Sequence, residues 1–387
     1  MIPLAIPNLA GREAEYLQEC VTSTYVSSVG PFVDRFEEQV ADAAGTRGAV
    51  AVASGTAGLH LALKIVGVEP GDLVALPALT FIASANAISY CGADPWLFDV
   101  SSESLTLDPQ QLGQALRRRL APRPDGRPVD RETGRRLGAL LPVHTLGHPA
   151  DMDSLVALGA ELEVPVVADA AAAIGADYRD RPIGRTGAAV SVFSFNGNKT
   201  VTAGGGGALA SDDGALLDRA RHLSTTARSG RDYVHDEVGF NYRMTNVQAA
   251  VGCAQMELVG EFVATKRRIQ AHYAEQLSGH GGARPLPEAS WARSACWFAG
   301  LVLDEWQPED VTRLREQLRA DGIDARPFWK PMHLQRPYAG APCEPQQETE
   351  RLWERILTLP CSTGITDAEL AQVTGAVHRG LVQRRAS

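Results

Sequence analysis

Cysteine is scarce in this chain of 387 residues, and none of its six cysteines forms a Cys-x-x-Cys pair. They are scattered between Cys20 and Cys361, which disfavours a disulfide framework or a zinc site and is typical of reduced thiols. No apolar run approaches the roughly 20 residues that a membrane helix needs. The N-terminus also lacks the basic and apolar regions of a signal peptide. We therefore expect a cytoplasmic protein without membrane spans.

Positive charge is scarce too. Lysine and arginine total 37 against 46 aspartates and glutamates, for a net charge of −9, which argues against a nucleic-acid partner. Two phosphate-binding signatures are missing: there is no P-loop, and no Gly-x-Gly-x-x-Gly follows a strand-like segment. The sequence therefore gives little support for an ATP-binding or a dinucleotide-binding protein.

Strand-like and helix-like segments alternate along the first half of the chain. Strand-like runs cover 48–53, 73–76, 96–100, 137–143 and 165–168, and helical patterns cover 57–66, 82–90, 108–120 and 152–162. This alternation predicts an α/β fold with a mainly parallel sheet between helices. Later segments break it, with helices at 245–258, 261–277, 308–321 and 367–382 and a strand at 298–303. We predict a large domain, residues 1–250, and a small C-terminal α+β domain, residues 251–387.

Residues 117–136 form an arginine-rich insertion with several prolines and glycines. The favoured interpretation is a solvated insertion at the rim of the sheet. The alternative is a flap that recruits anions.

Lys199 follows a β-branched and aromatic run, residues 190–195, and an Asn-Gly-Asn turn, and precedes four glycines at 204–207. A lysine delivered by a core strand into a glycine-lined turn is crowded and partly dry. Such an environment lowers the pKa of the amine and favours attack on a carbonyl. The alternative is a lysine on a solvated loop.

Two further segments strengthen the interpretation of Lys199. Ser54-Gly55-Thr56-Ala57 lies between a strand and a helix, where the helix N-terminus can bind an anion. Asp169 ends an apolar strand, at the edge where open α/β sheets bind ligands. Both Ser54 and Asp169 could instead simply cap helices.

Other candidates are weaker by themselves. Phe81 could stack on a planar cofactor or pack in the core, and Ser194 could join the anion site. Asn241 could be a cap or turn residue. His144 and His148 lie near Asp151 and Asp153, but they span a Gly-Pro turn without helical spacing, so we expect no metal site.

In order and spacing these segments resemble the DegT/StrS-type sugar aminotransferases, a pyridoxal-phosphate family of fold type I. The resemblance covers nearly the whole chain and is densest at residues 54–57, 77–81, 169–171, 194–199, 239–243 and 329–333. Residues 2–9, 195–199 and 326–334 are most similar to the branch that aminates C4 of UDP-4-keto-sugars toward legionaminic-acid-like products.

The resemblance implies a role for each candidate. Lys199 would hold pyridoxal phosphate as a Schiff base and move protons, Asp169 would pair with the ring nitrogen, and Phe81 would stack on the ring. The phosphate would lie against Gly55, Thr56, Ala57 and Ser194, and against Asn241 of a second subunit, so the active sites of a homodimer would be shared. Lys330 and His333 would approach the nucleotide-sugar.

The chain departs from the family at Ala172, three residues after Asp169, where Gln or His usually stands beside the 3-oxygen of the cofactor. The expected reaction transfers an amino group from L-glutamate to a nucleotide-linked keto-sugar. The alternatives are a keto-cyclitol or other ketone as acceptor, and a non-catalytic nucleotide-sugar-binding paralogue. A related dehydratase is disfavoured because those relatives replace the lysine with histidine.

Overall fold

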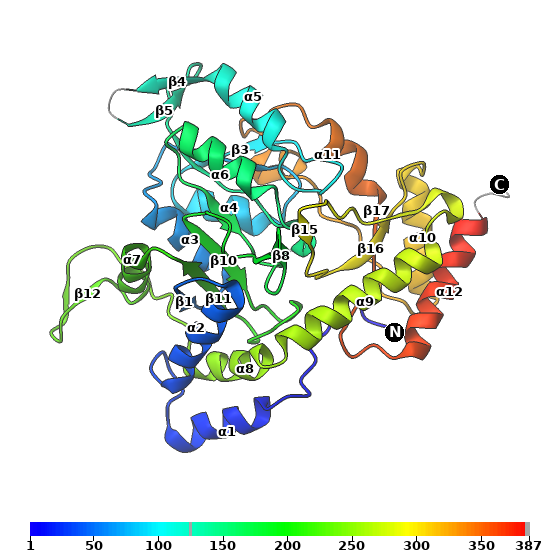
Figure 1. The fold of residues 1–387 in the computed structure, drawn as a ribbon, viewed down its shortest axis with the longest axis horizontal. Helices are drawn as coiled ribbons and strands as arrows, with labels where there is room; N and C mark the ends of the chain where they lie inside the picture. Colours follow the sequence, from blue (N-terminus) through cyan, green and yellow to red (C-terminus); the bar gives the residue numbers. More distant parts are fainter. Residues whose placement is uncertain (124–125, 384–387) are drawn as a thin grey trace.

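The computed structural model describes residues 1–123 and 126–383, and strands alternate with helices around a central sheet (Figure 1). In spatial order its strands are β3 (Asp94–Phe98), β2 (Leu73–Pro77), β6 (Leu137–Leu140), β7 (Val167–Asp169), β10 (Val190–Ser194), β11 (Gly207–Ser211) and β1 (Gly48–Val52). Parallel bridges between Leu140 and Val166 and between Val143 and Asp169 join β6 to β7, so both halves of this order form one sheet.

The sheet is mainly parallel, as the sequence predicts, but β11 is an exception. It runs antiparallel to both of its neighbours, β1 and β10. The connection from β10 to β11 contains the Lys199 turn and no helix. Parallel strands need a crossover, usually a helix, so a chain without one turns back antiparallel beside the strand it left.

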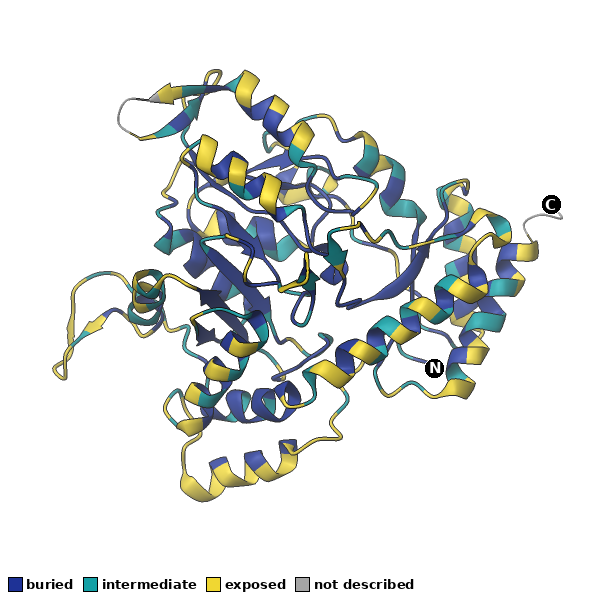
Figure 2. Cartoon of the chain, in the orientation of Figure 1, coloured by how far each residue is buried: buried dark blue, intermediate teal, exposed yellow. Residues whose placement is uncertain are grey.

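Both faces of the sheet are covered because alternate side chains of each strand enter different apolar clusters. In β1, Val50 and Val52 pack with one cluster, and Ala49 and Ala51 with the other. The helices of the first cluster are α3 (Gly55–Ile65), α4 (Ile82–Tyr90) and α7 (Gly214–Ser224). Those of the second are α1 (Glu13–Ser23), α2 (Pro31–Ala44), α5 (Pro109–Arg119), α6 (Met152–Glu161) and α8 (Asn246–Met256). The strands are accordingly buried between layers (Figure 2).

A separate apolar cluster belongs to the C-terminal part of the chain. It combines an antiparallel sheet with three long helices: β14 (Arg284–Pro285), β16 (Ala299–Val302), β17 (Ile356–Leu359), α9 (Val259–Leu277), α10 (Pro308–Ala320) and α12 (Asp367–Gln383). Ile2 and Leu4 pack into this cluster, and Ile2 bridges to Ile323. The N-terminal end of the chain therefore lies beside its C-terminal part (Figure 1). The division at residues 250 and 251 stays a prediction.

The remaining α-helix and strands are short. They are α11 (Gln347–Leu352) and the strands β4 (Leu120–Arg123), β5 (Gly126–Asp130), β8 (Asp177–Tyr178), β9 (Arg181–Pro182), β12 (Arg228–Ser229), β13 (Val234–His235) and β15 (Ala292–Arg293).

The arginine-rich insertion forms the β4–β5 hairpin at the rim of the sheet, apart from residues 124–125, which lie outside the described residues. Arg127 does not extend into solvent. Its guanidinium donates to the carbonyl oxygens of Val66, Gly67 and Gly138, the last at 2.8 Å. Arg119 pairs with the buried Asp130 at 3.0 Å. Arg127 thus fastens the hairpin to β6 and to the end of α3, and Arg119 fastens it to α5.

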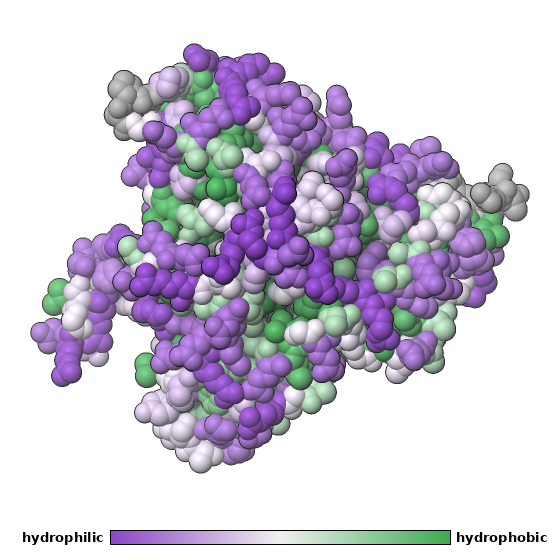
Figure 3. All heavy atoms as spheres, in the orientation of Figure 1, coloured by the Kyte–Doolittle hydropathy of each residue, from purple (hydrophilic) through white to green (hydrophobic). Residues whose placement is uncertain are grey.

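The surface is largely hydrophilic on the face drawn in Figure 3, with smaller apolar patches. Within the described ranges, no helix has the length and apolar character needed to cross a bilayer.

Candidate active site

A cavity of about 480 Å³ lies where the carboxyl ends of the central strands meet the C-terminal part of the chain. Five of the strands contribute residues that directly follow them to the cavity wall. The residues in question are Ser54, Gly55 and Thr56 after β1, Thr80 and Phe81 after β2, Val143 and His144 after β6, Ala171 and Ala172 after β7, and Asn196, Asn198 and Lys199 after β10. The last residues of two strands, Asp169 and Ser194, also line it.

Asp169 ends β7 with its side chain 5% exposed. Its Oδ2 accepts a hydrogen bond from Ser84 Oγ at 2.7 Å, and its Oδ1 accepts one from the Ala171 N–H at 3.1 Å. Burial raises the pKa of Asp169, while these hydrogen bonds and the charge of Lys199 act in the opposite direction. Asp169 is therefore a carboxylate that is fixed in position and has an increased affinity for a proton. Such a group suits a hydrogen bond with a partner that carries a proton.

Lys199 lies in the turn after β10, where its N–H donates to the Asn196 carbonyl oxygen at 3.0 Å. Its Nζ is 3.6 Å from the ring centroid of Trp297. The Trp297 ring is fixed because its Nε1–H donates to the Asn198 carbonyl oxygen at 2.7 Å. Burial lowers the pKa of Lys199 to about 8, although Asp169 acts to raise it. The environment is the crowded, partly dry one that the sequence predicts, not a solvated loop.

Close backbone packing shapes the start of α3. Ser54 is its N-cap, since Ser54 Oγ accepts from the Ala57 N–H at 3.1 Å. A Cβ added at Gly55 would lie 2.8 Å from Ser194 Cβ, and one added at Gly207 would lie 2.7 Å from the Ser54 carbonyl oxygen. Both glycines are therefore required for the helix start to approach β10 and β11. N–H groups in the first helical turn lack acceptors within the helix, so this cradle suits a phosphate.

Phe81 stands at the N-terminus of α4 and is 55% exposed, so it is not an ordinary core residue. Its ring centroid is 6.1 Å from that of Trp329. Trp297, Phe298, Phe328 and Trp329 continue the aromatic wall from the C-terminal part of the chain, together with the cation Arg326.

Four of the predicted site residues lie outside the lining of this cavity. Asn241 is exposed. Lys330 is exposed, and His333 Nε2 lies 3.2 Å from Glu350. Ala57 packs in the first turn of α3 behind Gly55 and Thr56. The roles predicted for these residues remain predictions.

Sequence reasoning did not identify Trp297, Arg326 or Trp329 as cavity residues or Ser84 as the partner of Asp169, and it considered His144 only as a metal ligand. Arg326 and Trp329 both lie within the motif at 326–334. Nothing local distinguishes Ser84 or Trp297, because Ser84 reaches Asp169, and Trp297 reaches the cavity, through tertiary packing.

The histidines near the cavity are engaged by the backbone. His144 Nδ1 accepts from the Ala150 N–H at 3.0 Å, and His148 Nε2 accepts from the Ala289 N–H at 2.9 Å. Asp151 accepts from Tyr178. These hydrogen bonds give His144, His148 and Asp151 structural roles. Within the described residues, they do not form a metal-binding group.

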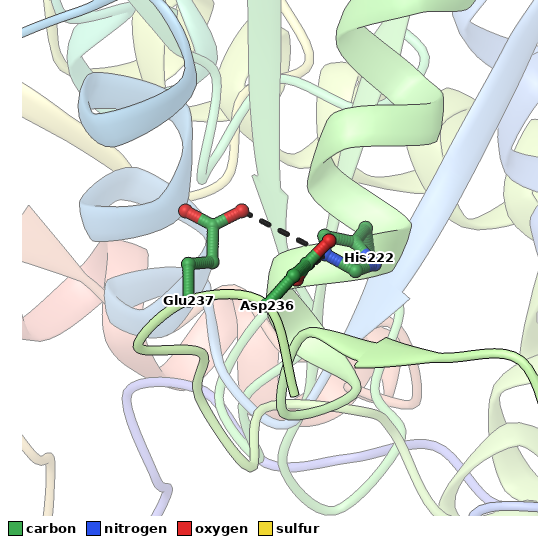
Figure 4. Close-up of side chains that lie close together, drawn as sticks. All are labelled: His222, Asp236 and Glu237. Atoms are coloured by element: carbon green, nitrogen blue, oxygen red, sulfur yellow. Dashed lines mark hydrogen bonds and ion pairs between the residues drawn. The ribbon is translucent and has the colours of Figure 1, made fainter. Parts of the chain in front are cut away.

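His222, Asp236 and Glu237 form another cluster, away from the cavity and near β13 (Figure 4). His222 Nε2 lies 2.8 Å from Asp236 Oδ1. Arg219 donates to both oxygens of Glu237, so much of the negative charge of the cluster is already paired.

The cavity fits pyridoxal phosphate on four observations. A glycine cradle faces the start of α3, a buried carboxylate ends β7, an amine of lowered pKa lies beside that carboxylate, and an exposed aromatic ring stands opposite. Gly55, Thr56 and Ser194 would hold the phosphate, Asp169 the ring nitrogen, Phe81 the ring face and Lys199 the aldehyde carbon.

Comparison with known proteins agrees with this geometry. The model of the DegT/DnrJ/EryC1/StrS aminotransferase family matches residues 7–378. The chain is 37% identical to a GDP-perosamine synthase of Caulobacter vibrioides over 383 residues, 98% of each chain.

Solved structures are similar as well. DesV of S. venezuelae, in complex with a ketimine intermediate, is 31% identical with a TM-score of 0.84, covering 96% of this chain and 94% of that one. DesI, in the presence of its TDP-sugar product, is 29% identical with a TM-score of 0.86, covering 100% and 94%. This chain therefore belongs to the DegT/DnrJ/EryC1/StrS family and is a pyridoxal-phosphate-dependent aminotransferase.

Proposed function

We propose that this aminotransferase moves the amino group of L-glutamate to C4 of a nucleotide-linked keto-sugar. The observation that carries the proposal is the cavity in which Lys199 and Asp169 face an aromatic wall that bears a cation. The names of the relatives support it, since one makes a GDP-linked product and another was solved with a TDP-sugar. The sequence resemblance to the C4-aminating branch supports the choice of carbon.

Bound pyridoxal phosphate supplies an aldehyde and a ring that withdraws electrons. Lys199 supplies the amine. With a pKa of about 8, a substantial fraction of Lys199 is neutral near physiological pH, so its Nζ would be able to hold the aldehyde carbon or to take a proton. Asp169, held by Ser84 and the Ala171 N–H, would keep a proton on the ring nitrogen of the bound cofactor. Trp297 limits the positions that Nζ can reach.

The outer wall suits a sugar joined to a diphosphate. Flat aromatic rings such as those of Trp297 and Trp329 offer apolar faces to a sugar ring. Arg326 is held by Asp324 at 2.8 Å through Nη2. A guanidinium has five donors, so further ones can meet phosphate oxygens. Lys330 and His333 lie in the same segment and would extend this contact.

The active enzyme is proposed to be a homodimer with shared sites. Asn241 is exposed and does not line the cavity of its own chain. Its predicted contact with the cofactor phosphate is thus one that a second subunit would receive. A symmetric dimer would complete two equivalent sites in this way.

The test is a panel of acceptors incubated with the loaded enzyme and L-glutamate. It should contain 4-keto-sugars linked to UDP, GDP and TDP, a 3-keto-sugar and a keto-cyclitol, with products read by mass spectrometry and the amination carbon by NMR. We expect amination of a nucleotide-linked 4-keto-sugar together with release of 2-oxoglutarate. Amination of the cyclitol alone would refute the sugar proposal. Binding of the nucleotide-sugar without release of 2-oxoglutarate would identify a non-catalytic paralogue.

A further inference from the structure

His144 is placed at the cofactor edge by the central sheet itself. It directly follows Val143, which bridges to Asp169. The main-chain N–H of His144 donates to the Asp169 carbonyl oxygen at 3.0 Å, and the residue lines the same cavity as Asp169 and Lys199. His144 is only 1% exposed, so its ring is enclosed by protein atoms and not by solvent.

The hydrogen bonding of His144 determines which ring nitrogen carries the proton. Nδ1 accepts from the Ala150 N–H at 3.0 Å, so Nδ1 carries none. Burial and the neighbouring His148 lower the pKa of His144 to about 3, which keeps the ring neutral. A neutral imidazole whose Nδ1 accepts has its proton on Nε2. His144 therefore presents an Nε2–H donor.

That donor has no partner among the residues that the structure describes. His144 Nε2 is buried and makes no hydrogen bond to any of the described residues. Leaving a buried donor unpaired costs free energy, so such an atom usually bonds a ligand or a water molecule. Ala172 also lines the cavity and has no polar side-chain atom, although Gln or His is expected there from the family resemblance.

We propose that the Nε2–H of His144 donates a hydrogen bond to the ring oxygen of pyridoxal phosphate, in place of the side chain missing at Ala172. His144 thereby tunes the cofactor without taking part in the transfer. A donor favours the ionised form of the oxygen it contacts. Removing it makes ionisation harder. The inference concerns the cofactor alone and is independent of the acceptor sugar.

The first test is the visible absorption of the loaded enzyme, titrated with pH in the absence of any amino donor. We expect His144→Leu to raise the midpoint of the band change by about one to two pH units, because a hydrogen bond to an ionised group is lost. His148→Leu is the matched control. His148 is also buried, accepts a backbone N–H and leaves Nδ1 unpaired, but it does not line the cavity. This control should destabilise the fold without moving the midpoint.

Two variants test for rescue. His144→Asn keeps both an acceptor for the Ala150 N–H and a donor, so its midpoint should stay close to that of the wild type. Adding Ala172→Gln to His144→Leu should return the midpoint toward the wild-type value. An unchanged midpoint in His144→Leu, or an equal change in His148→Leu, would overturn the proposal.

A measurement on the wild-type protein keeps the proposal testable if His144→Leu does not fold. Nitrogen-15 NMR of labelled histidines should show His144 as the Nε2–H tautomer, and its Nε2 resonance should shift when pyridoxal phosphate is added. The His148 resonances should stay in place. A His144 signal that titrates near neutral pH, or that ignores the cofactor, would refute the assignment.

Discussion

Ser84 Oγ donates a hydrogen bond to Asp169 Oδ2 at 2.7 Å across the interface between α4 and β7. Thr80 Oγ1 lies 2.9 Å from the same hydroxyl, so the serine is oriented from its other side as well. The carboxylate proposed to pair with the cofactor ring nitrogen is thus held by α4, and the N-cap of that helix is Phe81, the residue expected to stack on the ring. One helix would therefore position both the residue proposed to stack on the ring and the residue proposed to pair with its nitrogen.

We expect Ser84→Ala to weaken cofactor binding by about 10- to 100-fold, because a hydrogen bond to a charged group contributes about 1.5–3 kcal/mol. Without this donor, burial raises the pKa of Asp169 further. The measurement is a fluorescence or absorbance titration of the cofactor-free enzyme with pyridoxal phosphate. Ser89→Ala, on the same helix but bonded to Tyr338, is the control and should bind normally. Equal affinities in both variants would contradict the role of Ser84.

The low pKa of Lys199 predicts how the cofactor-free enzyme captures an aldehyde. Only the neutral amine attacks, so the capture rate should rise with pH and level off above a midpoint of about 8, against 10.5 for an ordinary lysine. Stopped-flow absorbance over pH 6–10 measures this profile.

Asp169→Asn should move that midpoint downward, because the Asp169 charge raises the pKa of Lys199 and its loss removes this opposition to burial. Lys199→Ala should lose turnover by at least about 10²- to 10⁴-fold, the usual contribution of a positioned acid and base. After borohydride treatment, peptide mapping should label position 199 in the wild type. A midpoint that rises in Asp169→Asn would show that the pair is wrongly assigned.

Gly55→Ala should disrupt the phosphate cradle. The new Cβ would lie 2.8 Å from Ser194 Cβ, so the start of α3 must shift, at a cost of about 1–3 kcal/mol in the free energy of unfolding. Chemical denaturation and cofactor titration should both register the change. Gly197→Ala is the control in the lysine turn, because an added Cβ there meets no atom within 4 Å. Comparable losses in the two variants would argue against the close approach.

Shared sites predict complementation between two inactive variants. Lys199→Ala lacks the amine, and Asn241→Ala lacks the contact donated to a second subunit. In a mixed dimer, one site combines an intact Lys199 with an intact Asn241. After random exchange of subunits in an equal mixture, activity should recover to about a quarter of the wild-type value. A mixture no more active than the average of its components would show that Asn241 does not act across subunits.

Much of the site was predictable because its signals are local. Lys199 follows a run of strand-forming residues and precedes glycines, and Asp169 ends another such run, so both were expected at the carboxyl edge of a parallel sheet. The requirement for Gly55 likewise follows from a strand-to-helix turn. The aminotransferase family and its cofactor, inferred from the order of these motifs, are confirmed.

The rest depended on contacts between distant parts of the chain. The antiparallel direction of β11, the packing of Ile2 and Leu4 against the C-terminal cluster, and the hydrogen bond between Ser84 and Asp169 are set by partners far away in sequence. The free Nε2–H of His144 belongs with them, since its tautomer depends on the backbone at Ala150. Sequence periodicity and turn residues determined which edge of the sheet carries the chemistry. Only the tertiary structure decided which second side chain meets each reactive group, because a hydrogen bond depends on distances that local patterns do not encode.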